Sequence, residues 1–185
     1  MSTATVHFYN QINFDTANLF RNLCLSALLG SSPRSDSLTI MFSSVGGNVK
    51  AGITMYEFLR TFPIPVTICN VGCVESIACI VFLGADTRIA MPNTHFKIHG
   101  FEWNFGESIA TYSDIADAYI SINSDIERYA KIFEERTKGA EREVDVRAHL
   151  RGVPLVLGCD DAATVGLTTM DTREIKLGFH GNHVY

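Results

Sequence analysis

Short apolar runs alternate with amphipathic segments along this 185-residue chain, and this alternation is the feature that most constrains its fold. Runs rich in strand-forming residues occupy 5–12 and 37–44. Each is followed by a segment with helical spacing, at 13–30 with Asp15 as a candidate cap, and at 49–62. Strands alternating with helices pack as a sheet covered by helices, so the sequence predicts an α/β fold.

The remaining elements follow the same pattern. A strand is predicted at 63–71, ending at Gly72, and the nearly apolar helix predicted at 75–85 must be buried. The others are two short strands around a Pro92-Asn93 turn at 87–100, helices at 139–152 and 159–167, and a closing strand at 173–180. No repeat, linker or low-complexity tract divides the chain, so residues 1–185 are predicted to form a single domain.

A long periodic segment runs from Glu107 to Thr137, with apolar residues every three or four positions. Helices in globular proteins average about 11 to 12 residues, so a helix of roughly thirty is unusual in a chain of this size. The segment is therefore predicted to protrude from the domain or to pack on another chain.

Composition and charge exclude several classes of protein. Hydrophobic residues make up 46% of the chain and charged residues 19%, which predicts a compact globule. The formal net charge of -5, without a Lys/Arg cluster, argues against nucleic-acid and anionic-membrane partners. The N-terminal segment lacks a signal-peptide pattern, and no run approaches the roughly 18 apolar residues of a membrane-spanning helix. We expect a cytoplasmic protein.

The cysteines show no pattern typical of a metal site. They form no CxxC pair and no spacing that suits zinc. Mostly apolar sequence surrounds them, so they are predicted to be reduced, buried thiols: Cys24, Cys69, Cys73, Cys79 and Cys159. We therefore expect neither a metal ion nor another cofactor.

Ser76 is the first candidate for chemistry. It follows a predicted strand and the Gly72 turn, and it precedes a predicted helix whose N-terminus would favour negative charge beside the hydroxyl. Taken alone, the residue is explained more simply as a cap or core serine. Glu75 directly before it raises a further question, because a carboxylate that faced the site would repel an oxyanion.

A glycine turn and a histidine flank this serine in sequence. Gly46 and Gly47 follow a strand and open a helix, which frees main-chain amides to meet a ligand or an oxyanion. His99 ends a predicted strand, and histidine is the usual base for a serine nucleophile near neutral pH. The combination of these residues indicates a serine hydrolase more strongly than any one of them.

Three ordered motifs carry a resemblance to the Clp protease proteolytic subunit, ClpP. The stretch "SSVGG" is similar to the family's "SPGG" turn, "PIPVTICNVGCVES" to its "p.pV.T...G.AAS" nucleophile turn, and "TRIAMPNTHFKIH" to its "R..lPn....iH" strand. The long helical segment and "DDAATVGL" extend the likeness, which runs from about Val6 to Leu167.

The resemblance implies the ββα-superhelical α/β fold shared by ClpP and crotonases, with a protruding handle helix between stacked heptameric rings. By position, Ser76 would be the nucleophile and His99 the base. The amides of Gly47 and Ile77 would form the oxyanion hole. The expected substrates are unfolded polypeptides, hydrolysed in the chamber of a homo-oligomer, and a Clp-type ATPase is a possible partner.

The acidic member of the family's catalytic triad has no clear counterpart. Its position falls between Ala148 and Leu150 and therefore brackets His149, which is taken as a tentative third member. Such a Ser-His-His set occurs in herpesvirus proteases. Asp145 lies one helical turn earlier and is the alternative, and Lys97 offers a separate Ser-Lys pairing.

Three functions remain open from the sequence. The first is a ClpP-like serine endopeptidase that forms an acyl-enzyme on Ser76. The second is a catalytically weak or inactive ClpP-like scaffold subunit of a mixed complex, which the missing acid motivates. The third is a crotonase-type acyl-CoA enzyme that would use the Gly46-Gly47 turn for a thioester oxyanion.

Overall fold

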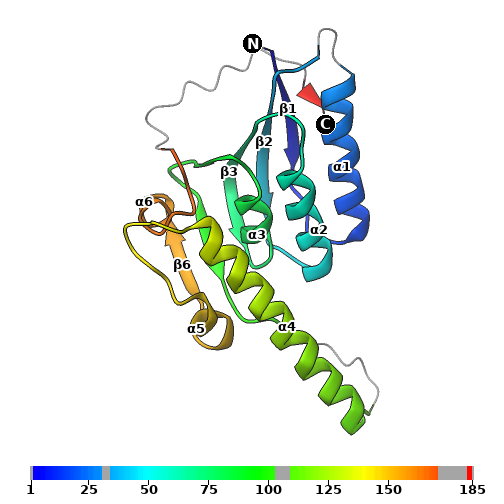
Figure 1. Cartoon of the computed structure of the whole chain (residues 1–185), viewed down its shortest axis with the longest axis vertical. Coiled ribbons are helices and arrows are strands. Elements are labelled where there is room, and N and C mark those ends of the chain that lie inside the picture. Colours follow the sequence, from blue (N-terminus) through cyan, green and yellow to red (C-terminus); the bar gives the residue numbers. More distant parts are fainter. Residues whose placement is uncertain (1, 31–33, 103–108, 171–182, 185) are drawn as a thin grey trace.

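A sheet organises the chain in the computed structural model, which describes residues 2–30, 34–102, 109–170 and 183–184 (Figure 1). The described strands are β1 Thr3–Phe8, β2 Ser37–Ser44, β3 Val66–Glu75, β4 Thr87–Ala90, β5 His95–Ile98, β6 Leu155–Gly158 and β7 His183–Val184. Their order is β6-β5-β3-β2-β1-β7, with β4 beside β3. All pairings are parallel except that of β5 with β6.

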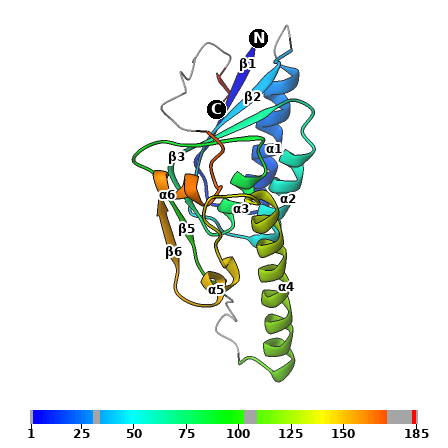
Figure 2. The same ribbon diagram turned by 60° about the vertical axis from the view of Figure 1, so that its left-hand side comes forward.

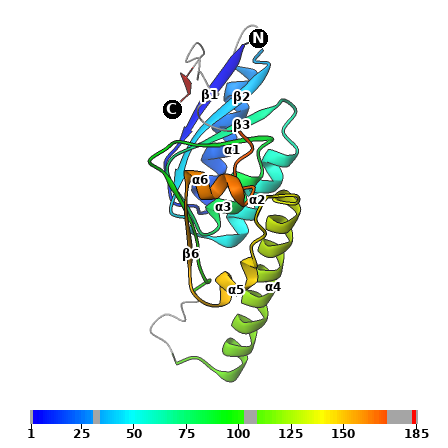
Figure 3. The same cartoon turned by 90° about the vertical axis from the view of Figure 1, so that its left-hand side faces the viewer.

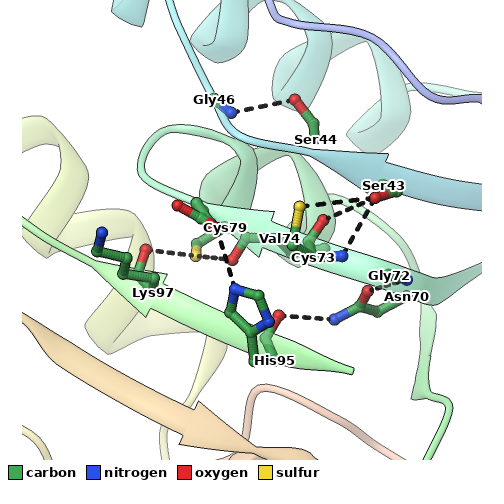
Figure 4. A network of polar contacts seen from close by, with 11 residues as sticks. Ser43, Ser44, Gly46, Asn70, Gly72, Cys73, Val74, Cys79, His95 and Lys97 are labelled. Atoms are coloured by element: carbon green, nitrogen blue, oxygen red, sulfur yellow. Dashed lines mark hydrogen bonds and ion pairs between the residues drawn. The ribbon is translucent and has the colours of Figure 1, made fainter. Parts of the chain in front are cut away.

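The strand β3 continues beyond Gly72, so the prediction that it ends there is wrong. Side chains replace part of the regular strand pairing around the glycine. Asn70 accepts a hydrogen bond from the Gly72 amide and donates one to the His95 carbonyl, each at 3.0 Å. The Ser43 hydroxyl accepts from the Cys73 amide at 3.1 Å (Figure 4). These contacts carry β3 from its pairing with β4 to its pairing with β5.

The helices agree with the predicted pattern but differ at their ends. They are α1 Phe14–Leu29, α2 Val49–Arg60, α3 Ala78–Leu83, α4 Tyr112–Arg136, α5 Val146–Arg151 and α6 Cys159–Thr164. Asn13, not Asp15, caps α1, because its side chain accepts from the amide of Thr16. In Figure 2, α1, α2 and α4 lie on the same side of the sheet.

The helix α5 covers only part of the predicted segment 139–152. Asp145 caps it by accepting a hydrogen bond from the Ala148 amide at 3.1 Å, which starts the helix at Val146. Figure 3 shows α5 between β6 and α4. This short helix therefore packs against the segment that follows β5.

The long helix predicted at 107–137 is present as α4, which has 25 residues. Residues 107 and 108 lie outside the described residues, and the helix begins after a capping box of Thr111 with Asp114. It extends beyond the sheet, as predicted (Figure 1). None of the described helices has both the length and the apolar composition needed to cross a membrane.

The closing strand predicted at 173–180 lies outside the described residues. A short strand nearer the carboxyl end, β7, pairs in parallel with β1. The strand β7 therefore forms the edge of the sheet beside β1.

Arg88 of β4 ties the ends of three helices together. Its side chain is 4% exposed and donates to the carbonyls of Ala85 after α3, Arg136 at the end of α4, and Gly166 and Leu167 after α6. A cation is favourable at helix C-termini, where main-chain carbonyls lack helical partners. Burial lowers the pKa of the Arg88 guanidinium to about 10. This value is still well above neutral pH, so the guanidinium remains charged.

Candidate active site

Two parallel strands bring Ser76 and His99 to the same edge of the sheet. Glu75, the last residue of β3, pairs with Lys97 of β5, and β5 ends one residue later at Ile98. The Ser76 amide donates to the Lys97 carbonyl at 2.7 Å. Since both strands run in the same direction, the serine and the histidine leave the sheet side by side.

Ser76 has a strained main chain. Its φ is 55°, and it is the one non-glycine residue with positive φ in the described part of the chain. The left-handed region is costly for residues with a side chain, and such outliers persist where the surrounding structure fixes them. The sharp turn from β3 into α3 therefore has the geometry of the nucleophile turns of serine hydrolases.

Two buried side chains hold this turn from below. The Tyr129 hydroxyl of α4 donates to the Ser76 carbonyl at 3.2 Å, and the Cys79 thiol donates to the Val74 carbonyl at 3.3 Å. Burial raises the pKa of the Cys79 thiol to about 12 and that of Tyr129 well above its usual 10, so both remain protonated donors. The sequence pattern identified Tyr129 only as an apolar-face residue. The feature that could have identified its role is the hydroxyl group, because a tyrosine hydroxyl that is buried in an apolar face needs a hydrogen-bond partner.

The glycine turn leaves a main-chain amide unused beside this serine. Ile12 donates to the Gly46 carbonyl at 2.7 Å and accepts from the Asn48 amide at 2.8 Å, so the hydrogen bonds of this bridge bypass the Gly47 amide. No acceptor among the described residues takes a hydrogen bond from the amides of Gly47 or Ile77. Two amides of the adjoining turns, those of Gly47 and Ile77, are thus without an acceptor.

Gly46 is the point of closest approach between the two turns. It has φ 88°, and a Cβ placed on it would lie 2.7 Å from the Ser76 Cβ and 3.3 Å from the Ile77 nitrogen. A side chain there cannot be accommodated without moving the Ser76 turn. The distances show that the glycine turn and the start of α3 face each other across the site.

For a serine hydrolase that acts through Ser76, we expect Gly46→Ala to lower turnover by more than about 100-fold, the order of the loss of an oxyanion-hole donor. Gly139→Ala is the matched control, because Gly139 has a similar φ of 84° but no neighbour within 4 Å of its added Cβ. Both substitutions strain the main chain, whereas only the first displaces Ser76. Equal losses of kcat at equal thermal stability would contradict this assignment.

His99 is partly buried, and its Nδ1 lies 2.8 Å from the Gly100 carbonyl oxygen. A carbonyl can only accept, so this hydrogen bond requires a proton on Nδ1. In the neutral ring the other nitrogen, Nε2, then has a free lone pair and can act as a base. The proposed base is thus held in one tautomer by the main chain.

The two candidates for the third member of the triad have other partners. His149 is partly buried, and its Nδ1 lies 2.9 Å from the Val153 carbonyl oxygen. The Asp145 carboxylate caps α5. The structure therefore places the Gly46 turn against Ser76 and Ile77, and it bonds Ser76 to Lys97, two residues before His99. The described hydrogen bonds of His149 and Asp145 go to Val153 and Ala148 instead.

The Glu75 carboxylate is engaged by a histidine of the neighbouring strand. Its Oε1 lies 3.0 Å from His95 Nε2. The same histidine's carbonyl accepts from Asn70, so it is fixed through both its side chain and its main chain (Figure 4). This pairing answers the question raised by the sequence, because it gives the carboxylate a partner other than Ser76.

A cavity of about 270 Å³ adjoins the glycine turn. It opens between the start of α2, the segment after His99 and one face of α4. Its walls mix apolar and charged groups: Gly47, Asn48, Val49, Lys50, Phe101, Glu102, Ser121, Ile122 and Asp125.

The five cysteines form no disulfide, and Cys24, Cys69 and Cys79 are buried as predicted. Cys73 and Cys159 are partly exposed. Within the described ranges, no three His, Cys, Asp or Glu side chains gather in a way that could hold a metal ion.

A strained serine after one strand and a histidine after its parallel neighbour form the candidate site, and these are residue types that serine hydrolases use. The model of the Clp protease family matches residues 1–168. The chain belongs to this family, and it is a divergent member.

Curated relatives share a quarter to a third of their residues with this chain. It is 34% identical over 102 residues to ATP-dependent Clp protease proteolytic subunit 2 of Treponema denticola, and 32% identical over 120 residues to the proteolytic subunit of Pleurastrum terricola. These matches cover 54% and 63% of this chain but only 50% and 60% of the relatives' own lengths. Subunit 3 of Rhizobium meliloti is 25% identical over 83% of this chain and 77% of its own.

The fold matches that of a solved Clp protease structure. A mutant of ClpP1 from Listeria monocytogenes superposes with a TM-score of 0.71 and 25% sequence identity, over 90% of each chain. The predicted ClpP-like α/β fold is therefore confirmed.

Proposed function

We propose that this chain is a ClpP-like serine endopeptidase that hydrolyses unfolded polypeptides through an acyl-enzyme on Ser76. The observation that carries the proposal is the strained Ser76 turn beside two amides without an acceptor. Strain is retained at such a position when the arrangement serves chemistry. Membership of the Clp protease family supports a peptidase.

In the proposed reaction, His99 acts first as a base and then as an acid in each half-reaction. His99 Nε2 takes the proton of Ser76 Oγ as this oxygen attacks the peptide carbonyl carbon. The amides of Gly47 and Ile77 receive the resulting oxyanion, each worth about 2.7 to 4 kcal/mol in serine hydrolases. Collapse breaks the C–N bond, and the protonated His99 gives its proton to the leaving amine. A water molecule then repeats the sequence on the ester and releases the carboxylate product.

The proposed working form is a homo-oligomer of heptameric rings, and α4 supplies its contact surface. The segment around the start of this helix exposes an apolar set: Ile109, Tyr112, Ile115, Tyr119 and Ile120, at 96%, 89%, 54%, 71% and 65%. Contiguous apolar groups of this size on a protein surface mark contact sites. A chamber formed by such rings would restrict the site to unfolded chains.

We expect Ile115→Asp combined with Tyr119→Asp to lower the sedimentation coefficient by disrupting the oligomer. A carboxylate is costly to bury in an apolar interface, whereas both positions tolerate it in an isolated chain. Val153→Asp is the control, because Val153 is 79% exposed but lies outside α4. An assembly that survives the double substitution unchanged would show that α4 does not form the interface.

A Clp-type ATPase is a proposed partner, since the relatives are named as subunits of ATP-dependent proteases. Such a partner would deliver unfolded chains to the chamber. Its contribution is measurable as ATP-dependent degradation of a folded substrate.

A second candidate is a catalytically weak or inactive scaffold subunit of a mixed complex. It is favoured by the partner of His99, which is a neutral carbonyl instead of a carboxylate. A carboxylate at this position stabilises the imidazolium that forms during proton transfer. A subunit without it could depend on active neighbours.

A fluorophosphonate probe distinguishes the two candidates. We expect the purified oligomer to be labelled covalently at Ser76, as mapped by mass spectrometry of the digested protein, and Ser76→Ala to remain unlabelled. Lack of labelling in a correctly folded and assembled wild-type protein would remove the endopeptidase and leave the scaffold subunit.

A further inference from the structure

We infer that the third group of the catalytic set is the main-chain carbonyl of Gly100, and that no side chain of α5 takes this role. The inference rests on the proposed function, since it concerns how His99 serves Ser76. The carbonyl oxygen of Gly100 lies 2.8 Å from His99 Nδ1, an ordinary hydrogen-bond distance. A group at this position has two tasks, to fix the tautomer of the base and to orient its ring.

A carbonyl performs both tasks without a charge. Because it can only accept, it keeps the proton on Nδ1 and leaves Nε2 free for the Ser76 hydroxyl. It also fixes the ring plane, since the acceptor belongs to the next residue of the chain. Only the electrostatic stabilisation of the imidazolium by a carboxylate is missing.

The Gly100 peptide is held from both sides. A Cβ on Gly100 would lie 3.0 Å from the Leu150 carbonyl oxygen, so the glycine rests against the end of α5. The next residue, Phe101, packs edge-to-face on Tyr129, with ring centroids 6.0 Å apart. Tyr129 also binds the Ser76 carbonyl. The support of the base and that of the nucleophile therefore meet at one buried tyrosine.

The two candidate side chains at α5 have hydrogen-bond partners other than His99. Asp145 satisfies the Ala148 amide at the start of the helix, and His149 meets the Val153 carbonyl beyond its end. What α5 presents to the segment after His99 is its main chain at Leu150. The helix thus supports the base indirectly, through Gly100.

Substitutions in α5 separate a carbonyl from a side-chain acid. We expect Asp145→Asn and His149→Gln to change kcat by less than about threefold. Asparagine caps helices as well as aspartate does, so the first variant keeps α5 intact. If either side chain completed the triad, its loss would lower kcat by about 10⁴-fold, the order measured when the acid of such a triad is neutralised.

Two glycines next to α5 form a matched pair for the positive test. Gly100→Ala brings a methyl group to the Leu150 carbonyl and shifts the carbonyl that His99 uses, so we expect kcat to fall more than about tenfold at unchanged KM. Gly152→Ala places a methyl group 2.9 Å from the Ala148 carbonyl of the same helix but has no link to His99. We expect this control to keep its kcat within about threefold.

Nitrogen NMR of the His99 ring reads the tautomer directly. We expect a protonated Nδ1 and an unprotonated Nε2 in the wild type at neutral pH, unchanged in the Asp145→Asn and His149→Gln variants. The pH profiles of kcat/KM of these two variants should coincide with that of the wild type. A changed tautomer, or a 100-fold or larger loss of kcat (about 2.7 kcal/mol) in either α5 variant, overturns the inference.

Failure of the proposed function has a different signature. If the wild type neither reacts with the fluorophosphonate probe nor cleaves peptides, the serine peptidase itself is excluded, whatever the tautomer of His99. An active wild type that loses its activity in an α5 variant excludes only the carbonyl.

Discussion

Ser76→Ala and His99→Gln should each lower the kcat of peptide hydrolysis by about 10⁴- to 10⁶-fold, and the double variant should lose no more than the larger single loss. The reason is that the hydroxyl and the imidazole act in one proton transfer, so either alone is ineffective. The amides of Gly47 and Ile77 remain in all three variants and should leave some catalysis above the uncatalysed rate.

Steady-state kinetics with a short fluorogenic peptide measure these losses, and sedimentation shows whether the variants still assemble. Lys97→Met is a useful companion, because it removes the amine of the Ser-Lys alternative while its main-chain bond to the Ser76 amide stays. A large loss in that variant combined with full activity of His99→Gln would assign the base to Lys97 instead.

Arg88→Leu should lower the free energy of unfolding by about 3 kcal/mol or more. The substitution leaves the carbonyls at the ends of α3, α4 and α6 without their donor, and each buried polar group left unsatisfied costs about 1 to 3 kcal/mol. Leucine is smaller than arginine, so a cavity adds to the loss. Urea unfolding followed by circular dichroism measures the change.

Arg60→Leu is the matched control for Arg88. Arg60 pairs with Asp86 at 3.7 Å, and both side chains are more than a third exposed, at 36% and 58%. Such surface pairs contribute about 0 to 1 kcal/mol, so this variant should unfold close to the wild type. Similar midpoints for both variants would mean that the carbonyls around Arg88 find other donors.

Most of the fold was predictable because periodicity is a local property. The run at 37–44 coincides with β2, and the two short strands around Pro92 and Asn93 are present as β4 and β5, each of which pairs with β3. The break at Gly72 was wrong because Asn70 and Ser43 compensate for it, and the contact of Ser43 with Cys73 spans 30 residues. Local sequence gives no sign of such a compensation.

The site was predictable where residues follow strand ends, and not where main-chain atoms act. The order of Gly46, Gly47, Ser76 and His99 indicated which turns lie near one another, since adjacent parallel strands end at one edge of the sheet. The role of the Gly100 carbonyl could not be predicted in this way, because every residue has a main-chain carbonyl and the sequence does not single one out. Its position depends on α5, some fifty residues further along the chain.

The two halves of the helix α4 have different roles. Its exposed first half is the proposed contact surface, and its buried second half holds the Ser76 carbonyl through Tyr129. A helix is stiff along its axis. A tilt that a neighbouring subunit imposed at Tyr112 would therefore also displace Tyr129. In the proposed oligomer, a subunit contact on the exposed half of α4 would therefore act on the position of the Ser76 carbonyl through Tyr129.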